Sequence, residues 1–144
     1  MYTEDFIPNQ QFKAIENGAV RSTAPSNIAL VKYWGKKPHQ IPANPSISFT
    51  LKNSKTTTTL NYQPKSSKGF SFEVFLEDAL KEDFRPKIQQ FFQRILAYAP
   101  YLETFHFVIK TSNTFPHSSG IASSASGMSA LALCLMQLES TLYN

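Results

Sequence analysis

Most of residues 19–110 consist of short segments in which apolar and polar side chains alternate, with one interruption that has helical spacing. Alternation with period two is typical of strands that bury one face. Apolar residues three and four positions apart indicate a helix, and such spacing occurs at Ile88, Phe91, Phe92, Ile95 and Leu96. Strands and helices are mixed without strict alternation, which predicts an α+β fold with a mixed sheet packed against helices.

The expected elements follow from these patterns and from Pro and Gly as breakers. Residues 1–18 are expected to be an extended leader, and Pro25 is expected to end the first strand. Residues 56–62 are β-branched and polar, so they are expected at an edge of the sheet or partly exposed. The predicted strands span 19–24, 27–33, 47–51 (half-buried), 56–62, 70–76 and 105–110. The predicted helices span 86–99 and a long stretch that begins in the loop 111–127 and ends near residue 140.

Length and composition limit the class of protein. A chain of 144 residues with 42% hydrophobic residues can form one domain with a real core, and 17% charged residues is too few for a disordered polyelectrolyte. The net charge of +4 is spread along the chain, which argues against nucleic acid as a partner. Cys134 is the single cysteine and lies in an apolar run, so we expect a buried thiol and no intramolecular disulfide. The polar N-terminus does not resemble a signal peptide, and no apolar stretch is long enough to span a membrane, so we expect a cytoplasmic protein.

The segment Asn27 to Lys36, NIALVKYWGK, combines a strand with a cationic and aromatic end. Strand ends and the loops after them often carry binding groups. Lys32 and Lys36 beside Tyr33 and the single Trp, Trp34, indicate a site for an anionic ligand. The alternative is that the lysines are ordinary surface charges and that Trp34 packs in the core.

A second segment, Pro116 to Ala125, reads PHSSGIASSA. Gly120 permits a backbone conformation or a close approach that a Cβ would hinder. A helix that begins here directs free N–H groups into the loop, and such a helix end attracts phosphates. No Lys-Ser/Thr pair follows the glycine, so the segment is not a Walker A loop. Serine-rich helix starts are also common as caps, and the segment alone leaves both readings open.

Together the two segments resemble the GHMP kinase superfamily, whose phosphate loop has Pro, three residues, Gly-Leu, one residue and Ser-Ser-Ala. Pro116, Gly120, Ser123, Ser124 and Ala125 match that pattern, with Ile121 in place of Leu. The first segment is similar to mevalonate diphosphate decarboxylases in particular, which carry Asn-Ile-Ala, Lys-Tyr-Trp-Gly-Lys, Pro-x-Asn and Ser-Leu-Ser. Here these are 27–29, 32–36, 42–44 and, with Ile for Leu, 46–48, and the Thr run 56–59 also resembles the family. The resemblance extends from about residue 24 to 138 and implies the N-terminal part of a GHMP-kinase-like (ribosomal protein S5 domain 2-like) fold.

The resemblance implies two groups of site residues. The residues that would bind mevalonate 5-diphosphate are Lys32, Tyr33, Trp34, Gly35, Lys36 and, on the predicted helix, Lys87. The residues that would bind ATP are Pro116, Ser118, Ser119, Gly120, Ser123, Ser124 and Ala125. Magnesium would accompany ATP, with Ser123 or Ser124 as its contact in this chain. The implied reaction is ATP-dependent decarboxylation to isopentenyl diphosphate in isoprenoid biosynthesis, in which positioning and charge stabilisation do most of the work.

The chain also departs from the family. Lys37-Pro38-His39, Pro45 and His117 replace residues of other types, and His117 is either a surface residue or a nucleotide contact. Family members are considerably longer, and their catalytic aspartate lies beyond residue 144, so we assign no catalytic residue and expect no decarboxylase activity from the 144 residues alone. We therefore expect one partial domain, 1–144, without the C-terminal domain, and a homodimer for the full-length protein. The alternatives are a mevalonate 3-kinase, a phosphomevalonate decarboxylase, or a non-catalytic fragment that self-associates.

Overall fold

The computed structural model describes residues 7, 11–32, 34–38, 41–117 and 120–143. Half of the predicted leader lies outside the described residues, and residues 11–17 have no regular secondary structure. The main elements are strands β1 (Gly18–Val31), β2 (Ile47–Pro64), β3 (Ser71–Leu76), β4 (Ala79–Leu80) and β5 (Phe105–Asn113), and helices α1 (Arg85–Ile95) and α2 (Ser123–Tyr143). Two short 3-10 helices, η3 (Glu82–Phe84) and η4 (Pro100–Glu103), flank α1. The predicted α+β class is confirmed.

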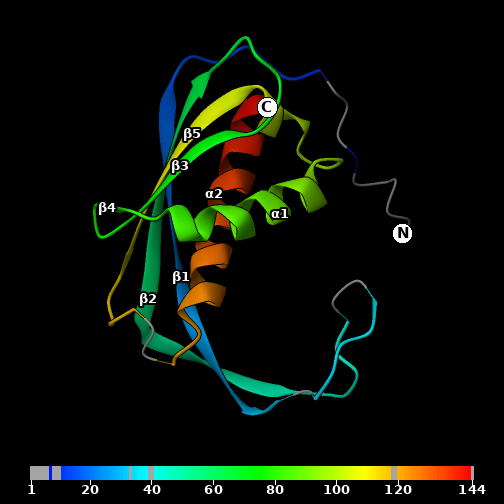
Figure 1. Ribbon diagram of the computed structural model, residues 1–144, viewed down its shortest axis with the longest axis vertical. Coiled ribbons are helices and arrows are strands. Elements are labelled where there is room, and N and C mark those ends of the chain that lie inside the picture. Colours follow the sequence, from blue (N-terminus) through cyan, green and yellow to red (C-terminus); the bar gives the residue numbers. More distant parts are fainter. Residues whose placement is uncertain (1–6, 8–10, 33, 39–40, 118–119, 144) are drawn as a thin grey trace.

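The five strands form one mixed sheet in the order β1-β2-β5-β3-β4. β3 and β5 are parallel, and the other neighbouring pairs are antiparallel. A parallel pair needs a long crossover, and here the crossover contains α1. Figure 1 shows α1 and α2 crossing each other on one face of the sheet. The cavity described below lies between that face and the two helices.

The core fills the space between the sheet and the helices. Alternate residues of β3 and β5 are buried, as period-two strands require. Phe92 of α1 is fully buried and meets the rings of Phe70, Phe72 and Phe107 at centroid distances of 5.7, 5.2 and 6.1 Å. Leu131, Leu135 and Leu138, the predicted core stripe of α2, are all buried. The phenylalanine-rich composition therefore builds the contact between α1 and the sheet.

One expectation about the first half of the sheet is wrong, and a second is right in only one of its two alternatives. Pro25 does not end a strand, because β1 continues through it with a register shift between Pro25 and Ser26. β1 is an edge strand, where a missing N–H is tolerated, especially at a bulge. Residues 56–62 do not lie at an edge, because they belong to β2, which pairs with β1 on one side and β5 on the other. The strand is partly exposed, as the other alternative expected, since its residues alternate between buried and half-buried. Thr56 and Thr58 are 1% exposed.

The outer parts of β1 and β2 extend past the helices as a two-stranded arm, defined here as residues 26–51 (Figure 1). The half-buried strand expected at 47–51 belongs to this arm, and its apolar face is largely exposed. Ile47 is 64% exposed and Phe49 46%. Leu30 and Val31 on β1 are 72% and 52% exposed. The alternation predicted the strand correctly, but not its surroundings.

Smaller differences concern local geometry. β4 was not expected, and it follows β3 after a turn at Glu77 and Asp78, whose φ angles are 49° and 61°. Two successive positive φ values are typical of a type I′ hairpin turn, which usually contains Asn or Gly. The helix predicted at 86–99 ends at Ile95, and Leu96 is its C-cap residue.

Candidate nucleotide site

A cavity of about 340 Å³ lies between the sheet, α1 and the first turns of α2. This volume is within the range of small-molecule pockets. One part of the lining is apolar, with Val74, Leu76, Phe84, Ile88, Ile109, Met128 and Leu131. The remainder is polar or small, with Thr56, Thr58, Thr111, Asn113, Lys87, His117, Ser123, Ser124 and Gly127. An apolar chamber with polar groups on one side suits a ligand that has a flat apolar part and a charged part.

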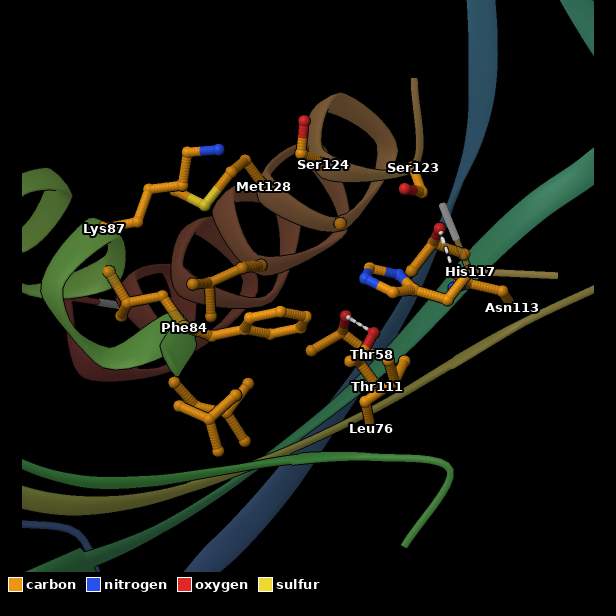
Figure 2. A pocket seen from close by; sticks show the side chains of 16 residues that line it. Thr58, Leu76, Phe84, Lys87, Thr111, Asn113, His117, Ser123, Ser124 and Met128 are labelled. Atoms are coloured by element: carbon orange, nitrogen blue, oxygen red, sulfur yellow. Dashed lines mark hydrogen bonds between the residues drawn. The ribbon is translucent and has the colours of Figure 1, made fainter. Parts of the chain in front are cut away.

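The polar wall comes from the two central strands. The hydroxyls of Thr58 and Thr111 are 3.1 Å apart and form a hydrogen bond, which Figure 2 shows at the floor of the cavity. Thr56 donates a hydrogen bond of 2.7 Å to Asn113 Oδ1. These residues are positioned by the β2–β5 register, which places Thr56 opposite Asn113 and Thr58 opposite Thr111.

The mouth of the cavity is formed by the beginning of α2 and the loop before it. Gly120 has φ 79°, a left-handed conformation that glycine adopts without strain, which is the role we expected for it. Ala122, a non-glycine residue, has φ 59°. Its carbonyl oxygen accepts hydrogen bonds from Ala125 N and Ser126 N, at 3.0 and 3.3 Å, so the helix starts at this point. The positive end of the α2 dipole therefore lies at the cavity, beside Ser123 and Ser124.

Not all residues of the second segment line the cavity. Ser123 and Ser124 do, whereas Pro116, Gly120 and Ala125 are exposed and are not part of its lining. Ser118 and Ser119 lie outside the described residues. His117 is exposed and also lines the cavity, where its ring contacts Phe84 at a centroid distance of 5.5 Å.

Lys87 lies with the serines and not with the first segment. Figure 2 shows Lys87 on α1 and Ser124 on α2 along the same side of the cavity. The sequence grouped Lys87 with Lys36 because of the family resemblance. In the fold, α1 brings it to the cavity that the beginning of α2 also lines.

The first segment forms the end of β1 and the loop of the arm. Trp34 is 96% exposed, which excludes the core-packing alternative, and Lys32 and Lys36 are exposed. The loop is ordered by Trp34 N, which donates to Asn44 Oδ1 at 2.8 Å, and by a bridge between Lys36 and Pro42. Gly35 is half-buried. Tyr33 lies outside the described residues.

The two segments meet at one end of the molecule. Ser26, immediately before the first segment, donates a hydrogen bond to the carbonyl oxygen of Ile121 in the second. They are 95 positions apart in the chain. The fold thus places the base of the arm next to the helix start.

Several cavity residues were not identified from the sequence. Phe84, Met128, Thr111 and Asn113 carry no local motif, and they meet Thr58 of the Thr run only through the sheet register and helix packing. The Thr run offered a signal, but its polar composition suggested an exposed strand. No cluster of three or more metal-ligating residues exists among the described residues.

Cys134 is not part of the cavity lining. It is fully buried, as predicted, and its thiol donates to Thr58 O at 3.3 Å. Burial raises the pKa of the Cys134 thiol, which makes the thiolate scarce. No helix in the described part of the chain is long and apolar enough to cross a membrane.

The fold and the cavity define an α+β domain with a helix-start loop suited to phosphate groups. The comparisons with known proteins are specific. The family model for the diphosphomevalonate decarboxylase-like N-terminal domain matches residues 24–143. The chain therefore belongs to the diphosphomevalonate decarboxylase family, through its N-terminal domain.

Individual relatives agree with this assignment. The human diphosphomevalonate decarboxylase is 34% identical over 137 residues, covering 83% of this chain and 33% of the relative. The Ganoderma lucidum enzyme is 33% identical, with 81% and 32% covered. The crystal structure of mevalonate diphosphate decarboxylase from Staphylococcus aureus superposes with a TM-score of 0.70 at 30% identity, covering 84% of this chain and 36% of that one. The chain thus spans about a third of the length of the relatives it matches.

Proposed function

We propose that this chain provides the ATP-binding and substrate-diphosphate-binding elements for the decarboxylation of mevalonate 5-diphosphate to isopentenyl diphosphate. The observation that carries the proposal is the cavity, because Lys87, Ser123 and Ser124 gather around one apolar chamber at a helix N-terminus. A relative called MDDEF, 31% identical and with a TM-score of 0.69, has been solved in complex with MVAPP, AMPPCP and magnesium. That complex supports ATP with Mg²⁺, and mevalonate 5-diphosphate, as ligands of this chain.

In the proposed complex the base and sugar of ATP occupy the apolar chamber, and its phosphates lie at the beginning of α2. The free N–H groups of the first helical turn and the helix dipole stabilise negative charge there. Lys87 adds a compact positive charge on the opposite helix. Bound magnesium would supply charge neutralisation of the phosphates, with Ser123 or Ser124 as the hydroxyl contact. This chain's residues bind and orient the nucleotide.

The arm is proposed to bind the substrate diphosphate through Lys36, with Lys32, Tyr33, Trp34 and Gly35 around it. The group that acts on the substrate is not assigned to this chain. By the family resemblance, full-length members are proposed to be homodimers with a C-terminal domain and to act in the cytoplasm.

The nucleotide site is tested by calorimetric titration of the 144-residue protein with MgATP. Lys87→Ala should weaken binding by about tenfold or more, since a charge-assisted contact contributes about 1.5–3 kcal/mol. Arg94→Ala is the matched control, because Arg94 is a cation on the last turn of α1 and is not part of the cavity lining. Equal affinities for the Lys87→Ala variant and the wild type would remove Lys87 from the site.

The nature of the substrate needs its own test. Trp34 is the single tryptophan, so its fluorescence reports directly on the arm. Titration with mevalonate 5-diphosphate, mevalonate 5-phosphate and mevalonate should change the emission in that order of affinity. A preference for mevalonate 5-phosphate would favour the phosphomevalonate decarboxylase alternative, and a preference for unphosphorylated mevalonate would favour the 3-kinase.

A second function is favoured by the exposed apolar residues of the arm. Leu30, Val31, Trp34, Ile47 and Phe49 present apolar surface to solvent. Such patches often mark protein interfaces. Sedimentation velocity over a range of concentrations distinguishes this interaction function from the enzymatic one. A non-catalytic interaction module would be favoured if the protein associates with rising concentration, if Ile47→Thr and Phe49→Thr abolish the association, and if the protein binds no MgATP.

A further inference from the structure

The buried polar residues of this protein are gathered at one place. Among the described residues, four polar residues are buried: Ser26, Thr56, Thr58 and Ser126, each at most 1% exposed. The rest of the core is apolar except for the Tyr101 hydroxyl and the Cys134 thiol. Burying a hydroxyl is unfavourable unless it is hydrogen-bonded, so four together call for an explanation.

Three of these hydroxyls connect the sheet to the two ends of the loop 114–122. Thr56 on β2 donates to Asn113 Oδ1 at 2.7 Å, at the residue where the loop begins. Thr56 Oγ1 also lies 2.7 Å from Ser126 Oγ, in the first turn of the helix where the loop ends. Ser26 on β1 donates to Ile121 O, near the same end of the loop. One residue, Thr56, therefore joins both ends of the loop to the central strand.

Each hydroxyl has a single proton, and this decides which residue donates in each of these hydrogen bonds. Thr56 has one hydroxyl proton and donates it to Asn113, so Ser126 is the donor in the bond with Thr56. The contact of Ser126 Oγ with Ser123 O, at 3.1 Å, is then the longer arm of a shared hydrogen bond. The chain of bonds runs from the helix start to β2 and on to β5, and each hydroxyl in it is used.

The backbone that this network holds is strained. Ala122 has φ 59°, which is uncommon for a residue with a Cβ. Strained residues persist where the surrounding structure fixes them, and they cluster at functional sites. Ile121, the preceding residue, is held by Ser26, and Ser126 is held by Thr56. Ala122 lies between these two fixed points.

We propose that Ser26, Thr56 and Ser126 are positioning residues, which fix the strained helix start at Ala122 so that the first turn of α2 presents its N–H groups to phosphate. The part that concerns phosphate rests on the proposed function; the part that concerns the helix start does not. A network that contributed stability alone could be replaced by apolar residues, since satisfied buried polar groups often add little net stability.

The test compares Thr56→Val, which keeps the shape and removes the hydroxyl, with Thr56→Ser, which keeps the hydroxyl. Thr57→Val is the matched control. Its hydroxyl is 2.9 Å from that of Thr23 in an exposed cross-strand pair, while Thr56 is buried. Amide hydrogen exchange by NMR is followed at Ala125 and Ser126, which donate to Ala122 O, and at core amides of β5.

We expect Thr56→Val to accelerate amide exchange at Ala125 and Ser126 at least about threefold and to leave exchange in β5 unchanged. Thr56→Ser, which keeps the hydroxyl, should exchange at these two amides as slowly as the wild type. Unchanged exchange at these two amides, or the same change in Thr57→Val, would overturn the proposal. If Thr56→Val does not fold, Ser126→Ala is measured in its place with the same expectation.

MgATP titration of the same variants tests the second part. Its dissociation constant should rise at least about threefold in Thr56→Val and stay at the wild-type value in Thr57→Val. Accelerated exchange with unchanged MgATP affinity would overturn the role toward phosphate. If wild-type protein binds no MgATP, the proposed nucleotide function fails, and the exchange data decide the positioning of the helix start independently.

Discussion

Phe92 is the side chain that holds α1 against the sheet, and its replacement should have a large and calculable effect. It is fully buried and packs edge-on against Phe70, Phe72 and Phe107. Each such aromatic pair contributes about 0.5–1.5 kcal/mol beyond the area it buries. Phe92→Leu keeps most of the apolar volume and loses these three pairs, so we expect a loss of about 1.5–4.5 kcal/mol. Phe92→Ala should cost about 3–5 kcal/mol, because it also leaves a cavity.

Urea denaturation followed by circular dichroism measures this loss. With a slope of about 2 kcal/mol per molar urea, Phe92→Leu should lower the midpoint by about 1–2 M. Phe91→Leu is the matched control, since Phe91 is the neighbouring residue, is only half-buried and has one ring contact, with Phe92 itself. If Phe92→Leu and Phe91→Leu shift the midpoint equally, the three ring contacts do not hold α1, and the reasoning is refuted.

The remaining predictions concern single side chains. Tyr101→Phe should destabilise the protein by about 1 kcal/mol because the Tyr101 hydroxyl donates to Leu135 O. Tyr143→Phe should stabilise it by about the same amount, because the buried Tyr143 hydroxyl has no hydrogen-bond partner among the described residues. Chemical denaturation measures both changes. Burial raises the pKa of Glu139, so the folded state holds a proton that the unfolded state has released, and stability should fall as pH rises from 4.5 through the raised pKa. Glu139→Gln should accordingly stabilise the protein at pH 7 but not at pH 3.5. Cys134 should react with a thiol reagent only after unfolding, and rapid labelling of native protein would contradict its burial.

The sequence predicted those elements whose pattern is local. The alternation in 70–76 predicted β3 nearly at its observed limits, and the helical spacing from Ile88 to Leu96 predicted α1 with its start correct within one residue and its end four residues too late. Pro25 was wrongly expected to end the strand. A proline interrupts a strand only where its missing N–H would have made a ladder hydrogen bond, and an edge strand with a bulge does not need that bond. Which strand lies at the edge depends on pairing, and the pairing of β2 with β5 joins residues about 50 positions apart.

The cavity illustrates a different limit. Its serines lie in a recognisable segment, but Thr56, Thr58 and Asn113 become functional candidates only when β2 and β5 pair and α2 packs over them. Polar residues in a strand are usually taken as solvent-facing. Thr56 and Thr58 instead form hydrogen bonds in the interior, with Asn113 and Thr111 of β5. A buried hydroxyl network cannot be distinguished from an exposed threonine run without the tertiary structure.

The two proposed subsites differ in how much of their wall this chain provides, and this difference predicts different affinities. The cavity has walls from β2, β3, β5, α1 and α2. The arm's loop is held by contacts inside the loop itself, such as Ala43 N to Gly35 O at 2.9 Å, and its Trp34 side chain is almost wholly in solvent. We therefore expect the 144-residue protein to bind MgATP measurably and mevalonate 5-diphosphate weakly, because an exposed lysine pairs with phosphate at high dielectric. Calorimetry with each ligand alone gives the comparison, and tighter binding of mevalonate 5-diphosphate than of MgATP would show that the arm is already a complete site.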